Sequence, residues 1–232
     1  MKIDFPYPGI NSIDIPDQNL LGIFAPSTVE IEKSEDEIIE EAFVHPVGSS
    51  PLHEILEWCQ DVLILVDDYT RTTPTQKILP RLMKELERGG IKREGIRFLI
   101  ASGTHRPMTE EEIITKLGKN IPRQYAILSH PWWDPSQLVY LGETTGQIPI
   151  YINRLVEEVD LIIGIGQIVP HRVSGFSGGG NIIQPGICGE ETTGKTHWLS
   201  AQFDGREILG RIFHGSTLFS VIIGGILPSS SI

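Results

Sequence analysis

Apolar residues form short runs at intervals through the middle of the chain, and these runs predict strands. Val62–Val66, Ile96–Ala101 and Leu161–Ile165 are almost continuously aliphatic, as expected for strands that are buried on both faces of a parallel sheet. A fourth strand is predicted around Tyr125–Ser129. Each run leads directly into a polar segment, so the pattern places polar side chains at the ends of buried strands.

Stripes of apolar residues at helical spacing predict helices between these strands. The clearest stripe runs from Ile78 to Leu86 and is closed by a glycine pair, which is common at helix C-termini. Ser34 and Glu37 have the spacing of a capping box, which predicts a short helix after Ser34. Further helical segments are predicted after Pro51, after Thr109, near Asn153–Glu158 and over Phe203–Ile212.

Strand and helix segments that alternate in this way predict a doubly wound α/β fold, in which helices flank a mostly parallel sheet. The first 26 residues contain four prolines and predict a small N-terminal β segment of short strands and turns. We expect residues 1–212 to form one α/β catalytic domain. The apolar stretch and serine tail at 213–232 do not continue the pattern, and we interpret them as an atypical end produced by truncation or a shifted reading frame.

Composition narrows the class of protein. The formal net charge of −11 argues against nucleic acid as a partner, because phosphate binding needs clustered Lys and Arg. No apolar run approaches the roughly 20 residues that cross a bilayer, and the N-terminus lacks the features of a signal peptide. The cysteines, Cys59 and Cys188, are too few for a disulfide framework. We therefore expect a cytoplasmic protein without membrane partners.

The polar segments after the strands carry the candidate chemistry, because ligands bind beyond the carboxyl ends of strands in such sheets. Arg71, in DDYTR, is a natural bidentate partner for a substrate carboxylate. His105 and His171 follow later strands, and the glycines from Gly175 onward expose backbone N–H groups suited to anions. The competing interpretations are that DDYTR only caps a helix, that the histidines are structural and that the glycines only make the loop flexible.

Gly189–Thr196 reads GEETTGKT and matches the P-loop pattern of nucleotide-binding proteins. A phosphate-binding loop should follow a hydrophobic strand, but QPGIC precedes this one. Glu190 and Glu191 would also place negative charge where a triphosphate should lie. A P-loop phosphotransferase that uses Lys195 and Thr196 stays open as an alternative function, and so does a non-catalytic fragment that binds an anion.

Five segments taken together resemble the nickel-dependent lactate racemase family: DDYTRTTPT, ASGTHRPMTEEE, HPWWDP, GQIVPHRVSGFSGGG and QPGICGEETTGKTHWLSA. The resemblance covers about Val62 to Arg211 and implies the N-terminal domain of a two-lobe α/β isomerase, with the C-terminal lobe largely absent. It implies a 2-hydroxy acid substrate that is racemised or epimerised. It also implies nickel held in a nickel-pincer nucleotide, a pyridinium-3-thioamide-5-thiocarboxylic acid mononucleotide, which cofactor-biosynthesis proteins would supply. Without the second lobe, we expect the isolated chain to have little or no activity.

The resemblance also implies a role for individual residues. His197 matches the protein ligand to nickel, His105 and His171 match the general acid and base, and Arg71 matches a substrate-orienting residue. The positions that match cofactor-binding residues are Asp68, Thr70, Gly175, Ser177, Gly178, Gly179 and Asn181.

In the implied reaction, one histidine takes the hydroxyl proton while the α-hydrogen leaves as hydride, which avoids the dianion that proton abstraction would create. The family's lactate enzyme carries a lysine that tethers the cofactor at the position of Asn181. Because asparagine cannot form that link, we predict a non-covalently bound cofactor. The same difference leaves the identity of the 2-hydroxy acid open.

Overall fold

The computed structural model describes residues 1–4, 9, 11–24, 29–144 and 146–211. The chain divides into two compact units, Met1–Ile38 and Ile39–Ile232, and each is described by itself. The final segment, 213–232, for which we predicted an atypical tail, lies outside the described residues.

The first unit contains the predicted small β segment. Strand β1 (Lys2–Ile3) pairs antiparallel with β2 (Ile13–Asp14), and a 3-10 turn, η1 (Asp17–Asn19), follows. Helix α1 (Glu35–Val44) begins here and continues into the second unit. Its capping box is formed as predicted, since the backbone N–H of Ser34 donates to Glu37 at 2.8 Å and the N–H of Glu37 donates back to Ser34 Oγ at 3.3 Å.

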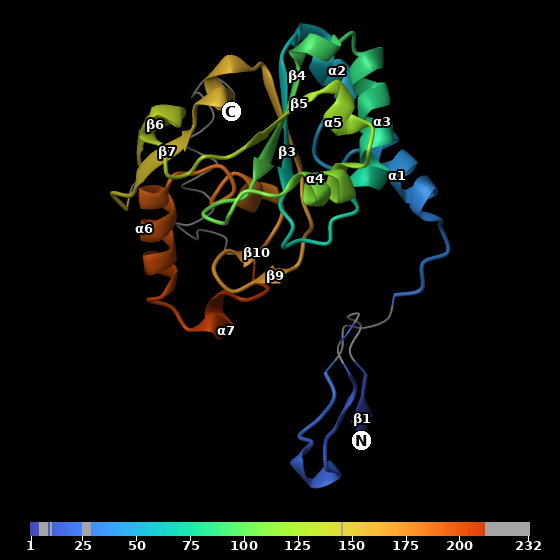
Figure 1. The fold of residues 1–232 in the computed structure, drawn as a ribbon, viewed down its shortest axis with the longest axis vertical. Coiled ribbons are helices and arrows are strands. Elements are labelled where there is room, and N and C mark those ends of the chain that lie inside the picture. Colours follow the sequence, from blue (N-terminus) through green and yellow to red (C-terminus); the bar gives the residue numbers. More distant parts are fainter. Residues whose placement is uncertain (5–8, 10, 25–28, 145, 212–232) are drawn as a thin grey trace. The chain divides into compact units, whose positions relative to one another are not determined.

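The second unit is built on a parallel sheet of four strands, which confirms the predicted fold class (Figure 1). The strand order is β5 (Ala126–Ser129), β4 (Ile96–Ala101), β3 (Val62–Asp67) and β8 (Leu161–Ile165). All residues of β3 are buried because this strand has a neighbour on each side and a packed layer on each face. The apolar runs therefore identified β3 and β4 correctly as buried strands, whereas β8, at the edge of the sheet, is only partly buried.

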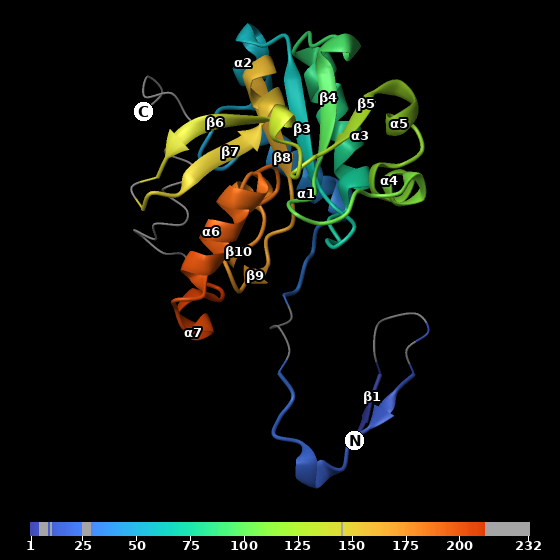
Figure 2. The ribbon, with the colours of Figure 1, turned by 60° about the vertical axis from the view of Figure 1, so that its left-hand side comes forward.

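One face of the sheet is covered by helices. Alternate residues of β3, such as Ile64 and Val66, pack against Leu79, Leu82 and Leu86 of α3 (Thr75–Arg88) in one buried cluster. Helices α4 (Glu110–Leu117) and α5 (Ile121–Gln124) lie on the same side of the sheet, as Figure 2 shows. The α3 stripe was thus correctly predicted to be the buried side of a helix.

The opposite face is covered in a way that the sequence pattern did not predict. Leu63 and Leu65 of β3 pack against Ile152 of an antiparallel hairpin, β6 (Leu138–Glu143) and β7 (Pro149–Asn153). Figure 2 shows this hairpin and α6 (Glu190–Ser200) on the side away from α3–α5. The register of the hairpin is irregular between Tyr140 and Glu143. This irregularity interrupts the alternation of apolar and polar residues by which a strand is recognised in a sequence.

The remaining elements are short connections. They are α2 (Leu52–Ile55), η2 (Leu56–Trp58), η3 (Arg93–Gly95), η4 (Pro135–Gln137), η5 (Arg154–Glu158), β9 (Pro170–His171), β10 (Gly175–Phe176), η6 (Gly179–Ile182) and α7 (Gly205–Ile208). The helix that we predicted over Phe203–Ile212 is therefore confined to α7 within the described residues. Helix α4 begins as predicted, because Thr109 and Glu112 form its capping box.

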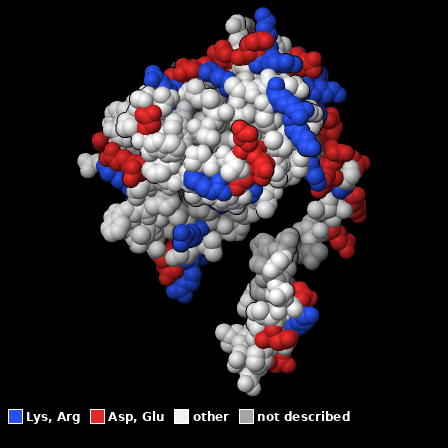
Figure 3. Space-filling model, viewed as in Figure 1, with Lys and Arg blue, Asp and Glu red and all other residues white. Residues whose placement is uncertain are grey.

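On the face that Figure 3 shows, acidic and basic side chains are interspersed. Among the described helices, none combines the length and the apolar character needed to cross a membrane.

We expect Ile64→Ala to lower the free energy of unfolding by about 3 kcal/mol, because it leaves a cavity beside α3 in a tightly packed core. Ile114→Ala is the matched control, since Ile114 on α4 is 40% exposed and should lose much less. Urea unfolding followed by circular dichroism measures both variants. Equal losses in the two would contradict the assignment of β3 to the core.

Candidate active site

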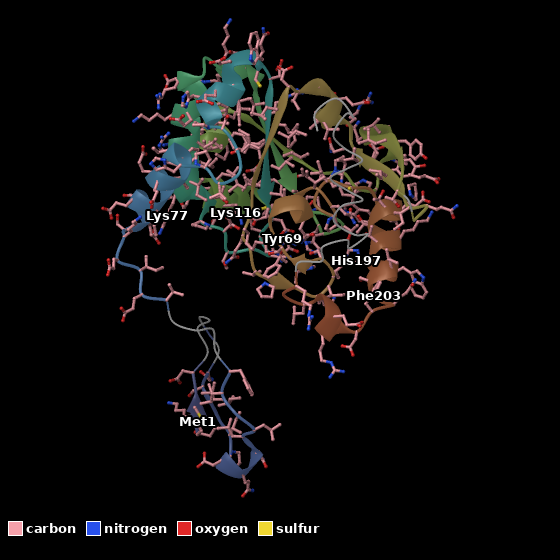
Figure 4. The ribbon with its side chains drawn as sticks, turned by 180° about the vertical axis from the view of Figure 1, so that it is seen from behind. Met1, Tyr69, Lys77, Lys116, His197 and Phe203 are labelled. Atoms are coloured by element: carbon pink, nitrogen blue, oxygen red, sulfur yellow. The ribbon has the colours of Figure 1, made fainter. Side chains whose placement is uncertain are left out.

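A cavity of about 140 Å³ lies where the loops after β3, β4 and β8 meet at the carboxyl edge of the sheet. Segment η6 and helix α6 complete its wall. The cavity brings together nearly all residues that we predicted for the site: Asp68, Thr70, Arg71, His105, His171, Ser177, Gly178, Asn181 and His197. Gly175 and Gly179 are the predicted residues that do not line it. Figure 4 labels Tyr69 of the first loop and His197 of α6.

His105 is held by a buried carboxylate. Its Nδ1 lies 2.7 Å from Asp68 Oδ2, and Asp68 is 3% exposed. The other carboxylate oxygen accepts hydrogen bonds from the hydroxyl and the backbone N–H of Thr70, at 2.5 and 3.0 Å. A carboxylate can only accept a hydrogen bond, so it favours the tautomer of His105 that carries its proton on Nδ1. A neutral His105 then has its lone pair on Nε2. His105 is therefore arranged to accept a proton at Nε2.

His171 has the opposite arrangement. The backbone N–H groups of Val173 and Ser174 point at its Nδ1 from 3.3 and 3.4 Å. Because an amide N–H can only donate, these contacts favour the tautomer that carries its proton on Nε2. Burial lowers the pKa of His171, and the positive charges of Arg71, His197 and Arg172 lower it further. A neutral His171 therefore carries its proton on Nε2, where it can donate a hydrogen bond.

His197 is suited to bind a metal ion. It lies on α6, one turn after Thr193, and its Nδ1 is 2.7 Å from the carbonyl oxygen of Thr193. The carbonyl oxygen accepts a hydrogen bond from the Nδ1–H group, and the lone pair on Nε2 stays available. This is the usual arrangement of a histidine that binds a metal. Within the described part of the chain, no group of three or more His, Cys, Asp or Glu side chains could hold a metal.

Arg71 supplies positive charge to the cavity. Its guanidinium group donates to Thr70 Oγ1 at 3.1 Å and makes no ion pair with any described residue. Most of its donors are thus free to bind an anion, and the planar group matches a carboxylate. The neighbouring Thr72 hydroxyl donates to Gln167 Oε1 at 3.1 Å, which links this loop to the loop after β8.

Several hydroxyl and amide oxygens at the cavity have no hydrogen-bond partner among the described residues. Ser102 Oγ, Asn181 Oδ1 and Thr193 Oγ1 are buried without a hydrogen bond, and all three residues line the cavity. Buried polar atoms in folded proteins normally have partners, so a cluster of unsatisfied ones indicates a place for a polar ligand. Ser102 and Thr193 were not predicted from the sequence to be site residues. Ser102 directly follows β4, and Thr193 precedes His197 by four residues on one helix, so strand ends and helical spacing could have identified them.

The glycine-rich segment after His171 has two different functions. Gly178 lines the cavity with φ of +72°, and a side chain there would come within 2.9 Å of the Gln167 carbonyl oxygen. Gly175 instead packs against the backbone, since a Cβ atom would lie 2.2 Å from Arg211 O. Ser177 is buried, and its hydroxyl donates to the Gln167 carbonyl at 2.6 Å. Gly178 and Ser177 therefore shape the cavity wall, whereas Gly175 allows close packing behind it.

The segment that matches the P-loop pattern does not form a phosphate-binding loop. Gly194, Lys195 and Thr196 lie inside α6, where the backbone N–H groups are committed to the helix. Lys195 Nζ pairs with Glu191 at 2.8 Å and lines a different groove. A P-loop phosphotransferase is therefore excluded by the local structure.

The fold and the cavity define a class of protein: an α/β domain with an imidazole-rich cavity at the carboxyl edge of a parallel sheet, where ligands bind in such folds. A family model described as the lactate racemase N-terminal domain matches residues 9–207. The chain belongs to this family. This confirms the family that the sequence motifs indicated.

Relatives of known structure and function support this assignment. The chain is 34% identical to lactate racemase from Lactiplantibacillus plantarum over 200 residues, which cover 85% of this chain and 47% of the relative. It is 30% identical over 190 residues to lactate racemase from Thermoanaerobacterium thermosaccharolyticum, covering 81% and 44%. The structure of the lactate racemase apoprotein from T. thermosaccharolyticum superimposes with a TM-score of 0.81 at 25% identity, over 97% of this chain and 54% of that one. The chain thus spans about half the length of these relatives.

We expect the imidazole of His171 to titrate below its ordinary pKa of 6.5, which NMR of the imidazole resonances would measure. Because the fold favours the neutral ring, the contribution of this group to stability is lost as the pH falls below 6.5 towards the folded-state value. Arg71→Gln should raise the pKa of His171 by removing the largest of the charge effects. Arg172→Gln is the control and should raise it less. A midpoint at or above 6.5 in the unsubstituted protein would contradict this electrostatic description.

Proposed function

We propose that this chain forms the catalytic N-terminal half of a racemase or epimerase that acts on a 2-hydroxy acid with a nickel-pincer nucleotide as cofactor. One observation carries the proposal: three imidazoles and one guanidinium from distant stretches of the chain, His105, His171, His197 and Arg71, line the same cavity. The names of the relatives support a racemase in general.

The residues present fit this cofactor. His197 would hold the nickel of the cofactor through its Nε2, since imidazole nitrogen is a suitable ligand for nickel. The unpartnered oxygens of Ser102, Asn181 and Thr193 offer hydrogen bonds to the polar groups of the nucleotide. When bound, the cofactor supplies a site that reversibly accepts a hydride. Nickel and the nucleotide would come from cofactor-biosynthesis proteins.

Arg71 and the two acid–base histidines perform the remaining steps in this proposal. Arg71 binds the substrate carboxylate and orients the α-carbon. His105 takes the hydroxyl proton at Nε2 as the α-hydrogen leaves as hydride, and Asp68 stabilises the imidazolium that forms. The product of this half-reaction is a planar 2-keto acid.

The second half-reaction returns both hydrogens. His171, after taking up a proton from solvent, donates its Nε2 proton to the keto oxygen while the hydride is restored on the other face of the planar carbon, and His105 releases the proton that it took to solvent, so that both imidazoles end the cycle neutral. One proton and one hydride leave the substrate and one of each is restored, so the reaction inverts the configuration without net oxidation. Abstraction of the α-hydrogen as a proton would instead place a second negative charge beside the carboxylate, which one guanidinium would compensate poorly.

His197→Ala should lower the nickel content of the chain at least about tenfold after coexpression with the cofactor-biosynthesis proteins, because it removes the protein ligand. Nickel is measured by mass spectrometry of the metal, and racemisation of lactate and malate by chiral chromatography. His45→Ala, at an exposed site, is the matched control. Equal nickel contents in His197→Ala and the control would refute the proposed ligand.

Asn181 predicts a non-covalent cofactor, since its amide cannot form the link that a lysine amine can. Native mass spectrometry of the loaded chain should show a cofactor-sized adduct, and denaturing mass spectrometry should show the mass of the bare polypeptide. An adduct that survives denaturation would contradict the prediction.

A further inference from the structure

Lys116 is a buried lysine that the proposed reaction does not use. It lies in the last turn of α4, the helix that follows the His105 loop, and its side chain is only 8% exposed. It does not line the cavity. Figure 4 labels Lys116 together with Tyr69 of the loop after β3.

The ammonium group of Lys116 makes three contacts, all with the loop that carries Arg71. Its Nζ lies 2.5 Å from Asp67 Oδ1, and it donates to the backbone carbonyl oxygens of Asp68 at 3.2 Å and of Arg71 at 2.9 Å. The two carbonyl contacts are hydrogen bonds, whereas the contact with Asp67 Oδ1 is an ion pair. Asp67 Oδ1 has no other partner among the described residues.

These contacts act on the backbone conformation of the loop. The Asp68 carbonyl that Lys116 binds also accepts the N–H of Arg71 at 3.2 Å, which closes the turn between the two residues. Binding of the Arg71 carbonyl fixes the other side of the same turn. The direction in which the Arg71 guanidinium and the Asp68 carboxylate leave the backbone therefore depends on Lys116.

A second connection closes a ring of contacts around the site. Asp68 is joined to His105 by the contact of 2.7 Å, His105 leads into α4 through the capping box at Thr109, and α4 returns to Asp68 through Lys116. The loops after β3 and β4 are thus fixed to each other at two points. A lysine that only neutralised Asp67 would need neither carbonyl contact.

We infer that Lys116 is a positioning residue, which holds the Asp68–Arg71 turn so that Arg71 presents its guanidinium to the carboxylate of a 2-hydroxy acid and Asp68 its carboxylate to His105. The identity of this ligand rests on the proposed function. The geometry of the turn does not.

Lys116→Met tests the inference, because it keeps an apolar side chain of similar length and removes the three donors. Lys119→Met, at an exposed position just after α4, is the matched control. We expect hydrogen exchange at the Arg71 amide to accelerate at least about tenfold in Lys116→Met alone, with the amides of β3 and β4 unchanged. We also expect the dissociation constant for lactate, measured by NMR titration of the chain, to rise about tenfold.

Lys116→Met could also lose stability because it leaves the Asp67 carboxylate buried without a counter-charge. The double variant Lys116→Met/Asp67→Asn separates the two effects, since it removes both charges and keeps an oxygen that can accept the hydrogen bond from Thr73. A positioning role predicts that the double variant regains stability but keeps fast exchange at Arg71 and weak lactate binding.

Two results would overturn the inference. One is an Arg71 amide in Lys116→Met that stays as protected as in the control. The other is recovery of both amide protection and lactate affinity in the double variant, which would show that Lys116 only neutralises Asp67. If the unsubstituted chain binds no lactate, the proposed substrate class fails, and hydrogen exchange at Arg71 still decides the role of Lys116.

Discussion

The site depends on the parallel pairing of β3 with β4 and β8. Residues Val62–Val66 are in register with both neighbours, so the three strands end at nearly the same level. Parallel strands point the same way, and the loops that leave them therefore meet at one edge. This is why Asp68, His105 and Gly166, which are far apart in sequence, line one cavity. Any change that shifts the register of β3 would separate them.

The electrostatics of the site follow from the burial of two adjacent carboxylates at the end of β3. Asp67 and Asp68 are both buried, and each has a different cationic or imidazole partner: Lys116 behind the loop and His105 at the cavity. Because both carboxylates have other partners, Arg71 has no carboxylate partner within the described chain and is available to bind an anion. The low pKa of His171 follows from the same positive charge together with burial.

The family assignment favours one function, and the local structure argues against the alternatives. Membership of the lactate racemase N-terminal domain family supports a racemase, and the helix over Gly194–Thr196 argues against the P-loop phosphotransferase. The shared cavity argues against a fragment whose three histidines are unrelated. The unpartnered oxygens of Ser102, Asn181 and Thr193 destabilise the fold unless a ligand binds them, which is typical of a binding site.

The sequence by itself determined the buried strands, the α3 stripe and the polar segments at the strand ends, because burial on both faces requires continuous apolar runs. Its motifs also indicated the family, and nearly all of the site residues that they indicated line the cavity. Only the tertiary structure decided which carboxylate pairs with which cation, which tautomers His105 and His171 adopt, and that Lys116 holds the Arg71 loop. These features are contacts between residues tens of positions apart, and they depend on side-chain directions that no local pattern records. The β6–β7 hairpin was missed for a related reason, since its stability comes from packing on Leu63 and Leu65 rather than from its own alternation.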